Sequence, residues 1–237
     1  MIKKKILIIA PHPDDEVLGC GGTIAKYTES ENEVYLCIGT KAYAPDWSKE
    51  FIKNRKKEIK KSNKILKIKK TYFLDFPTAK LDTVPQKQIN DELIKIFHKV
   101  RPDILFIPHG GDLNKDHRIL FEASLVAARP ISYKIKKIVS YEVLSETEWG
   151  SPIQEFKPNF YIGISLSNLN KKIEAMAPFE SEVKKYPHPR SKEIIKALAQ
   201  KRGSEAGLEF AEAFSIIRET DPHEEYERFI KQINREK

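Results

Sequence analysis

Short apolar runs alternate with amphipathic stretches along most of this chain. The apolar runs have the length of buried strands and lie at 5–10, 33–39, 71–74, 103–108, 138–143 and 159–164. Helical periodicity between them predicts helices at 22–28, 49–66, 85–100 and 117–128. Strands that alternate with helices are typical of a mainly parallel sheet flanked by helices. We therefore predict an α/β fold of the Rossmann-like, doubly wound type.

The alternation weakens after about residue 145. Gly150, Pro152 and Pro158 predict a long loop at 146–158. Helices are predicted at 168–185 and 191–205, with two prolines between them that forbid a continuous helix. The charged residues from Asp221 onward predict a peripheral helix. Since a single core can grow to roughly 250 residues, we expect one domain over 1–237, with a C-terminal helical and loop extension.

The formal net charge of +8 raises the question of an anionic partner. Much of the excess lies in the lysine-rich stretch 53–70, where Ile recurs at helical spacing, so we interpret it as a solvated helix face and expect no nucleic-acid partner. The spacing of Cys20 and Cys37 indicates neither a metal knuckle nor a disulfide framework. No stretch approaches the roughly 18 apolar residues of a transmembrane helix. We expect a cytoplasmic protein.

Polar clusters follow two of the predicted strands. His12, Asp14 and Asp15 come directly after the first strand, and Asn114 and His117 follow the strand at 103–108. In doubly wound sheets, functional groups gather beyond the carboxyl ends of the strands where the strand order reverses, and the first and fourth strands are neighbours there. We therefore expect the two clusters to meet in one crevice.

His12, Asp15 and His117 together offer two imidazoles and one carboxylate. Three such ligands with a fourth position open are typical of catalytic zinc, whose bound water has a pKa near about 7. Asp14 would then lie beside the metal as a general base. Each residue taken alone could instead be a helix cap or an incidental loop residue, and it is the combination that favours a metal site.

The first cluster resembles a known family. His12-Pro13-Asp14-Asp15-Glu16, followed by a Gly-Cys-Gly-Gly-Thr helix start, is similar to the PIG-L/LmbE-like de-N-acetylases. Further matches lie at 55–58, 112–117, 141–143, 147–149, 157–159, 186–191, 202–203 and 211–214. The resemblance implies one zinc ion per chain on His12, Asp15 and His117, with Asp14 as base. It also implies hydrolysis of the N-acetyl group of an N-acetylglucosamine-containing small molecule or glycoconjugate, with release of acetate and a free amine.

One position departs from the family pattern. Many members carry a second histidine, thought to help stabilise the oxyanion, where this chain has Asn114. An asparagine amide can donate a hydrogen bond but cannot carry a positive charge, so oxyanion stabilisation should depend more on the metal. His109 could compensate, or it could be a structural loop residue.

Three further residues are candidates for substrate binding. By resemblance, the Arg55 guanidinium should reach substrate oxygens; the alternative is an Arg55–Glu58 pair on an exposed helix turn. Trp149 could stack on a sugar or lie buried under its loop. His188, between two prolines, could belong to a mobile loop that contributes to the site or to a neighbouring subunit, or it could be structural.

Two other functions are alternatives. The same three ligands occur in non-haem iron oxygenases, but those enzymes usually have a β-barrel that the strand and helix alternation contradicts. A basic non-catalytic module that binds an anionic glycan or nucleic acid would leave the metal ligands unexplained. We expect a small N-acetylated sugar as substrate. The resemblance also allows a homo-oligomer, and the choice among glycosides, lipid-linked sugars, thiol-cofactor precursors and disaccharides stays open.

Overall fold

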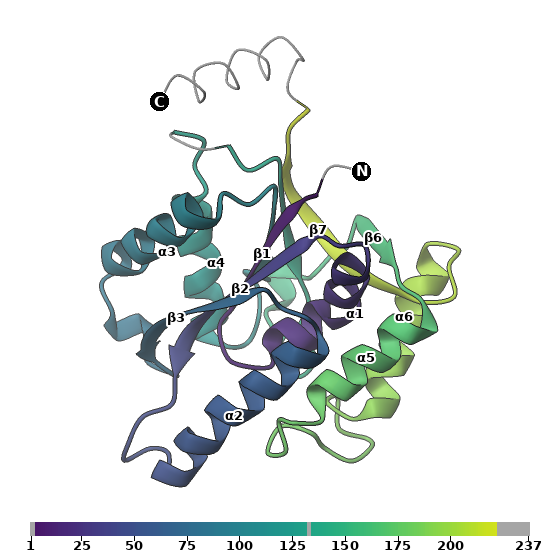
Figure 1. Cartoon of the computed structure of the whole chain (residues 1–237), viewed down its shortest axis with the longest axis horizontal. Coiled ribbons are helices and arrows are strands. Elements are labelled where there is room, and N and C mark those ends of the chain that lie inside the picture. Colours follow the sequence, from purple (N-terminus) through teal and green to yellow (C-terminus); the bar gives the residue numbers. More distant parts are fainter. Residues whose placement is uncertain (1–2, 132–133, 222–237) are drawn as a thin grey trace.

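A computed structural model of the chain describes residues 3–131 and 134–221 (Figure 1). Seven strands form one sheet in the order β3-β2-β1-β4-β5-β7-β6. Their bounds are β1 Lys5–Ala10, β2 Glu33–Lys41, β3 Lys70–Pro77, β4 Ile104–Pro108, β5 Lys137–Tyr141, β6 Phe160–Gly163 and β7 Ala211–Glu219. Strands β1 to β5 pair in parallel, and β7 pairs antiparallel with both β5 and β6. This is the doubly wound order that the sequence predicts, and β1 and β4 are neighbours as expected.

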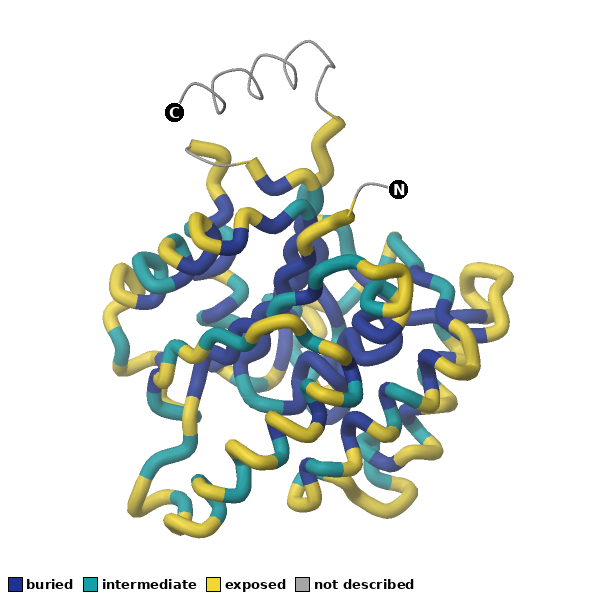
Figure 2. The backbone as a smooth tube through the Cα atoms, in the orientation of Figure 1, coloured by how far each residue is buried: buried dark blue, intermediate teal, exposed yellow. Residues whose placement is uncertain are grey.

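Six α-helices cover the described sheet: α1 Asp15–Glu29, α2 Lys49–Ile65, α3 Gln86–Val100, α4 Lys115–Ala127, α5 Leu166–Met176 and α6 Lys192–Glu205. Short 3₁₀ helices lie at Leu81–Thr83 and Pro152–Gln154. Successive residues of β1 point to opposite faces of the sheet. Ile6 and Ile8 pack with α1, α5 and α6, whereas Leu7 and Ile9 pack with α3 and α4. The apolar core is therefore split into two layers around a central strand that is buried from Ile6 to Ala10 (Figure 2).

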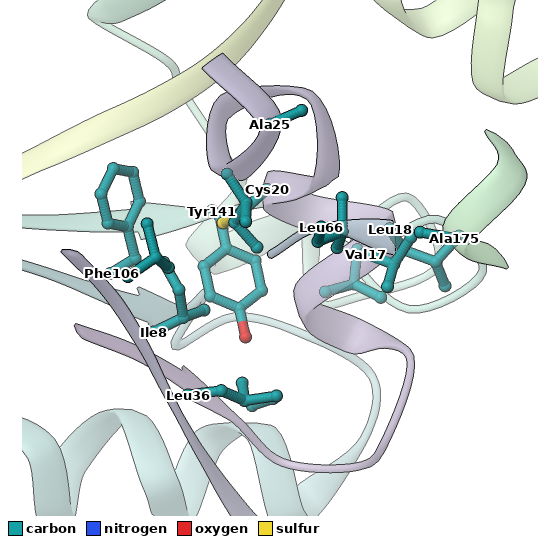
Figure 3. Packing of buried hydrophobic residues seen from close by; sticks show 14 of the residues in the cluster. Ile8, Val17, Leu18, Cys20, Ala25, Leu36, Leu66, Phe106, Tyr141 and Ala175 are labelled. Carbon is teal, nitrogen blue, oxygen red and sulfur yellow. The ribbon is translucent and has the colours of Figure 1, made fainter. Parts of the chain in front are cut away.

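Helix α1 begins at Asp15, seven residues before the predicted start at Gly22. The sequence predicts that these glycines open the helix; they lie inside it instead and allow close packing. A Cβ at Gly19 would lie 2.2 Å from the ring of Tyr141, and one at Gly22 would lie 2.6 Å from Ile164. The Tyr141 ring packs under α1 beside Cys20 (Figure 3). The correction places Asp15 in the first turn of a helix.

Two predictions for the C-terminal part were wrong. The helix predicted at 168–185 ends at Met176, because Pro178 has no N–H to continue the helical hydrogen bonds. Strand β7 was not predicted at all, although it lies inside the sheet between β5 and β6. The peripheral helix predicted beyond Asp221 lies outside the described residues.

Candidate active site

The two polar clusters meet at the carboxyl ends of β1 and β4. The loop after β1 is fixed by Thr40, whose backbone N–H and Oγ1 both donate to the Pro11 carbonyl at 3.0 and 2.9 Å. The loop after β4 ends at Asn114, whose Oδ1 caps α4 by accepting from the Asp116 N–H at 3.0 Å. His117 then lies in the first turn of α4 and is fully buried.

His12, Asp15 and His117 form a close triangle. His12 Nδ1 and His117 Nε2 each lie 3.2 Å from Asp15 Oδ2, and the two nitrogens lie 3.3 Å apart. Ligands bound about 2.0–2.1 Å from a tetrahedral zinc ion are about 3.3 Å from one another. The three predicted ligand residues are thus brought together with the spacing of three corners of a zinc tetrahedron.

Each imidazole of the triangle contacts a carboxylate through its other nitrogen. Asp116 Oδ2 lies 3.0 Å from His12 Nε2, and Asp112 Oδ2 lies 2.8 Å from His117 Nδ1. Asp112 also accepts from Thr147 Oγ1 at 2.6 Å. Carboxylates in this position hold the ring and leave the opposite nitrogen free for a metal. Asp112 and Asp116 have no role in the prediction from sequence. Their position within five residues of His117 is the sequence feature that could have identified them.

The surrounding acids give the site a strong preference for positive charge. Burial alone would lower the pKa of His12, but hydrogen bonds with Asp116 and Asp15 raise it to about 9. Burial would likewise lower the pKa of His117, yet the charges and hydrogen bonds of Asp15 and Asp112 raise it to about 10. Burial opposes ionisation of Asp15, but the two imidazoles hold its pKa well below the usual range. A cation is therefore favoured inside this triangle.

Asp14 lies next to the triangle in an uncommon conformation. It is buried, and its φ of 117° is in the left-handed region. The Glu16 carboxylate accepts from its N–H at 3.1 Å. Burial and the charge of Asp15 raise the pKa of Asp14 well above the usual value, and Arg190 opposes this rise. A carboxyl group with a raised pKa suits a general base near neutral pH.

Arg190 is a site residue that the sequence did not reveal. Its Nη1 lies 3.3 Å from Asp14 and 2.8 Å from Glu182, and its Nη2 lies 3.5 Å from Glu146. The only sequence signal was its place beside His188 in the segment between the last two helices.

A cavity of about 570 Å³ opens above the triangle. It is lined by His12, Pro13, Asp14, Ile38, Thr40, Lys41, Ala42, Trp47, Phe51, Ile52, Arg55, Lys56, Ile59, Phe73, Asp75, Thr78, Asn114, Glu146, Glu182 and Arg190. Trp149 and His188 are not among the lining residues; their rings contact each other with centroids 6.4 Å apart. Trp149 is 53% exposed, so it is not buried under its loop. His109 contacts the Gln154 carbonyl at 2.8 Å and does not line the cavity either.

Arg55 both faces the cavity and pairs with Glu58, so it combines the two arrangements that the sequence allows. It lines the cavity, and its Nε also lies 3.3 Å from Glu58. Its Nη2 donates to Glu182 at 2.7 Å, and its guanidinium lies 4.8 and 5.4 Å from the ring centroids of Phe51 and Phe179. The Nε and Nη2 groups of this guanidinium therefore already have protein partners.

The lysine-rich helix α2 buries only Ile59 and Ser62, and its lysines are exposed, as a solvated face predicts. Among the described residues, no helix is both long and apolar enough to cross a membrane.

The chain is similar to known proteins. The family model for PIG-L, described as GlcNAc-PI de-N-acetylase, matches residues 7–128. Diacetylchitobiose deacetylase of Thermococcus kodakarensis is 28% identical over 228 residues, which covers 90% of this chain and 83% of that protein.

Solved structures share the fold. N,N'-diacetylchitobiose deacetylase from Pyrococcus horikoshii matches with a TM-score of 0.73 at 24% identity, covering 90% of this chain and 84% of that one. The 4-carboxy-2-hydroxymuconate hydratase GalB from Pseudomonas putida KT2440 matches with a TM-score of 0.72 at 18% identity, covering 93% and 98%. Since this fold also carries a hydratase, the activity has to be argued from the side chains of the site.

Proposed function

The chain belongs to the PIG-L family, described as GlcNAc-PI de-N-acetylases, and from this membership we propose that it is a zinc-dependent hydrolase of N-acetylated amino sugars. The observation that carries the proposal is the triangle of His12, Asp15 and His117 with Asp14 beside it, at one end of a cavity. The coarser conclusion, a sugar deacetylase, is supported by the family and by the related deacetylases.

The donor set fits zinc. Two imidazole nitrogens and one carboxylate oxygen are the ligands of several catalytic zinc sites, and such sites keep a further position open. A zinc ion held there would polarise the acetamide carbonyl and lower the pKa of water. Iron accepts the same donors, but the parallel sheet differs from the barrel in which such iron sites usually lie.

The chain's own residues supply the proton transfers. Asp14 accepts a proton from the attacking water as the water oxygen bonds to the acetyl carbon. The same carboxyl group then gives a proton to the sugar nitrogen as the carbon–nitrogen bond breaks, so that acetate and a free amine leave. Asn114 lines the cavity while its Oδ1 faces the Asp116 N–H, and its amide group is left to donate to the oxyanion.

A screen for acetate release tests the proposal. Protein purified without added metal is analysed for zinc and iron, and is then assayed with a panel of N-acetylated amino sugars with and without a chelator. We expect zinc-dependent acetate release from at least one of them. Iron as the bound metal would contradict zinc, and salt-sensitive binding of nucleic acid or anionic glycan without acetate release would favour the binding-module alternative. A single domain over 1–237, a homo-oligomer and a cytoplasmic location stay predictions.

A further inference from the structure

The cavity has two chemically different ends. The polar end, with His12, Asp14 and Asn114, comes from the β1 and β4 side of the sheet. The other end comes from β2, α2, β3 and the loop before α2. Its apolar residues are Ile38, Ala42, Trp47, Phe51, Ile52, Ile59 and Phe73. Strand β2 is next to β1 and β3 lies one strand further out, so with neighbouring strands about 4.8 Å apart this end extends sideways from the strand that carries His12.

The apolar end joins two buried core residues, Ile38 and Ile59, to a more exposed wall. Phe51 and Ile52, in the first turn of α2, are only partly buried, and Phe73 on the edge strand β3 is 51% exposed. The first half of α2 therefore presents the apolar side chains of Phe51 and Ile52 to the cavity. The whole cavity, at about 570 Å³, falls within the range of about 300–1,000 Å³ that is typical of sites for drug-sized ligands.

Most polar groups near this end have protein partners, although Arg55 Nη1 is buried without a hydrogen-bond partner and Lys56 also lines the cavity. Thr78 Oγ1 donates to Thr40 Oγ1 at 3.0 Å, and Thr40 Oγ1 donates to the Pro11 carbonyl. Lys41 Nζ lies 3.7 Å from Asp75. The Arg55 guanidinium is held by the carboxylates named above. A sugar ring here would bury hydroxyl groups with few free partners, and a buried hydroxyl without a partner weakens binding.

We propose that the apolar end binds an alkyl or aryl aglycone, so that the substrate is an N-acetylated amino sugar with an apolar group on its anomeric oxygen. The inference rests on the proposed deacetylase function, because it assumes that the acetamide lies at the triangle. Trp47, Phe51, Ile52 and Phe73 are then specificity-determining residues.

Substrates that differ only in the aglycone test the inference. The zinc-loaded protein is assayed with the methyl and hexyl β-glycosides of N-acetylglucosamine, below the micelle concentration, and with diacetylchitobiose. We expect kcat/KM for the hexyl glycoside to exceed that for the methyl glycoside by about 30-fold or more, since a single methylene in an apolar pocket can contribute about tenfold. Equal values, or a larger advantage for the disaccharide, would overturn the inference while leaving the deacetylase in place.

A matched pair of variants locates the effect. Phe73→Ser should lower the hexyl-to-methyl ratio of kcat/KM about tenfold. Leu166→Ser, at a side chain that is also 51% exposed but outside the cavity, should leave the ratio unchanged. Equal ratios in wild type and Phe73→Ser would refute the assignment of this wall.

Binding can be followed without catalysis. In Trp149→Phe protein, Trp47 is the sole tryptophan, and hexyl β-glucoside, which has no acetyl group, should change its fluorescence in a saturable manner. Phe73→Ser should weaken that binding about tenfold. Saturable binding without acetate release from any substrate would defeat the proposed function and keep the apolar subsite. If binding is not saturable, the assignment of the apolar subsite is refuted.

Discussion

Arg190 Nη1 lies 3.3 Å from Asp14 Oδ2, although 176 positions separate the two residues in the sequence. The same guanidinium lies within 2.8 Å of Glu182 and donates from Nε to Ser145 Oγ at 2.7 Å. It therefore joins the loop after β1, the loop after β5 and the segment between α5 and α6. One positive charge is shared among several acids beside the metal triangle.

Arg190→Ala should lower kcat about 10- to 100-fold while the zinc content stays near wild type, because Asp14 loses the group that positions its carboxylate. Arg190→Lys should restore part of the loss, since the charge returns without the fork of donors. The measurement is kcat and KM for acetate release together with zinc analysis.

Arg202→Ala is the matched control for this prediction. The Arg202 side chain is 12% exposed, against 14% for Arg190, and it pairs with Glu142 and Glu205 outside the cavity. It should lower the melting temperature and leave kcat unchanged. Equal losses of kcat in the two alanine variants would reduce Arg190 to a structural role.

Asp14→Asn should reduce acetate release by about 10²- to 10⁴-fold, the usual contribution of a general base. Asparagine keeps the shape of the side chain and tolerates a positive φ, so zinc stoichiometry should stay nearly intact. His117→Ala should lower both zinc content and turnover, because it removes a ligand. Turnover close to wild type in Asp14→Asn would mean that another group is the base.

Asp112→Asn and Asp116→Asn should each weaken zinc binding about 10- to 100-fold, because each carboxylate orients one ligand imidazole. The dissociation constant is measured by competition with a chromogenic chelator. Asp82→Asn serves as control, since Asp82 is exposed and pairs only with Lys115 among the contacts described for it. Equal zinc affinity in all three variants would show that Asp112 and Asp116 do not strengthen zinc binding.

Zinc binding should depend steeply on pH. The surrounding acids raise the pKa of His12 to about 9 and of His117 to about 10 in the metal-free protein, although burial opposes this. Both rings are then protonated at pH 7, so zinc has to displace protons and its affinity should rise from pH 7 toward pH 9. Calorimetry in buffers of different ionisation enthalpy counts the released protons, and we expect more than one at pH 7.

The raised pKa values of His12 and His117 also predict how metal removal affects stability. A pKa raised above the unfolded value of 6.5 gives stability that is complete below pH 6.5 and is lost as the pH rises through about 9 to 10. Chelator-treated protein should therefore lose melting temperature between pH 7 and 10, and zinc-loaded protein should lose much less. Parallel curves for the two forms would contradict the raised pKa values.

The metal triangle was predictable because its three ligands lie in short polar motifs directly after strands, where topology alone brings them together. Arg190 was not, since it lies in an irregular segment with no periodicity, and only the tertiary fold brings it to Asp14. The start of α1 was placed seven residues too late because the glycines were taken to open the helix. They lie inside it, and their close contacts with Tyr141 and Ile164 are visible only in the packed structure.

Strand β7 was missed because it carries a buried charge, and this charge carries the last prediction. Glu212 lies 2.6 Å from Lys172 Nζ, both side chains are 4% exposed, and the carboxylate accepts from the N–H groups of Gly22 and Thr23 at 3.0 and 2.7 Å. It therefore connects β7 to α1 and α5. The alternation that identifies a strand is broken by a carboxylate whose partner is 40 residues away.

Glu212→Ala should lower the free energy of unfolding by about 3–5 kcal/mol, because it leaves the buried Lys172 ammonium without its partner. Adding Lys172→Met should recover part of this loss, since it removes the unpaired charge. The exposed pair of Lys171 and Glu29 is the comparison, and Lys171→Met should change stability by less than about 1 kcal/mol. Urea denaturation measures all three. A loss below about 1 kcal/mol for Glu212→Ala, or no recovery in the double variant, would show that this buried pair does not anchor α1 to the sheet.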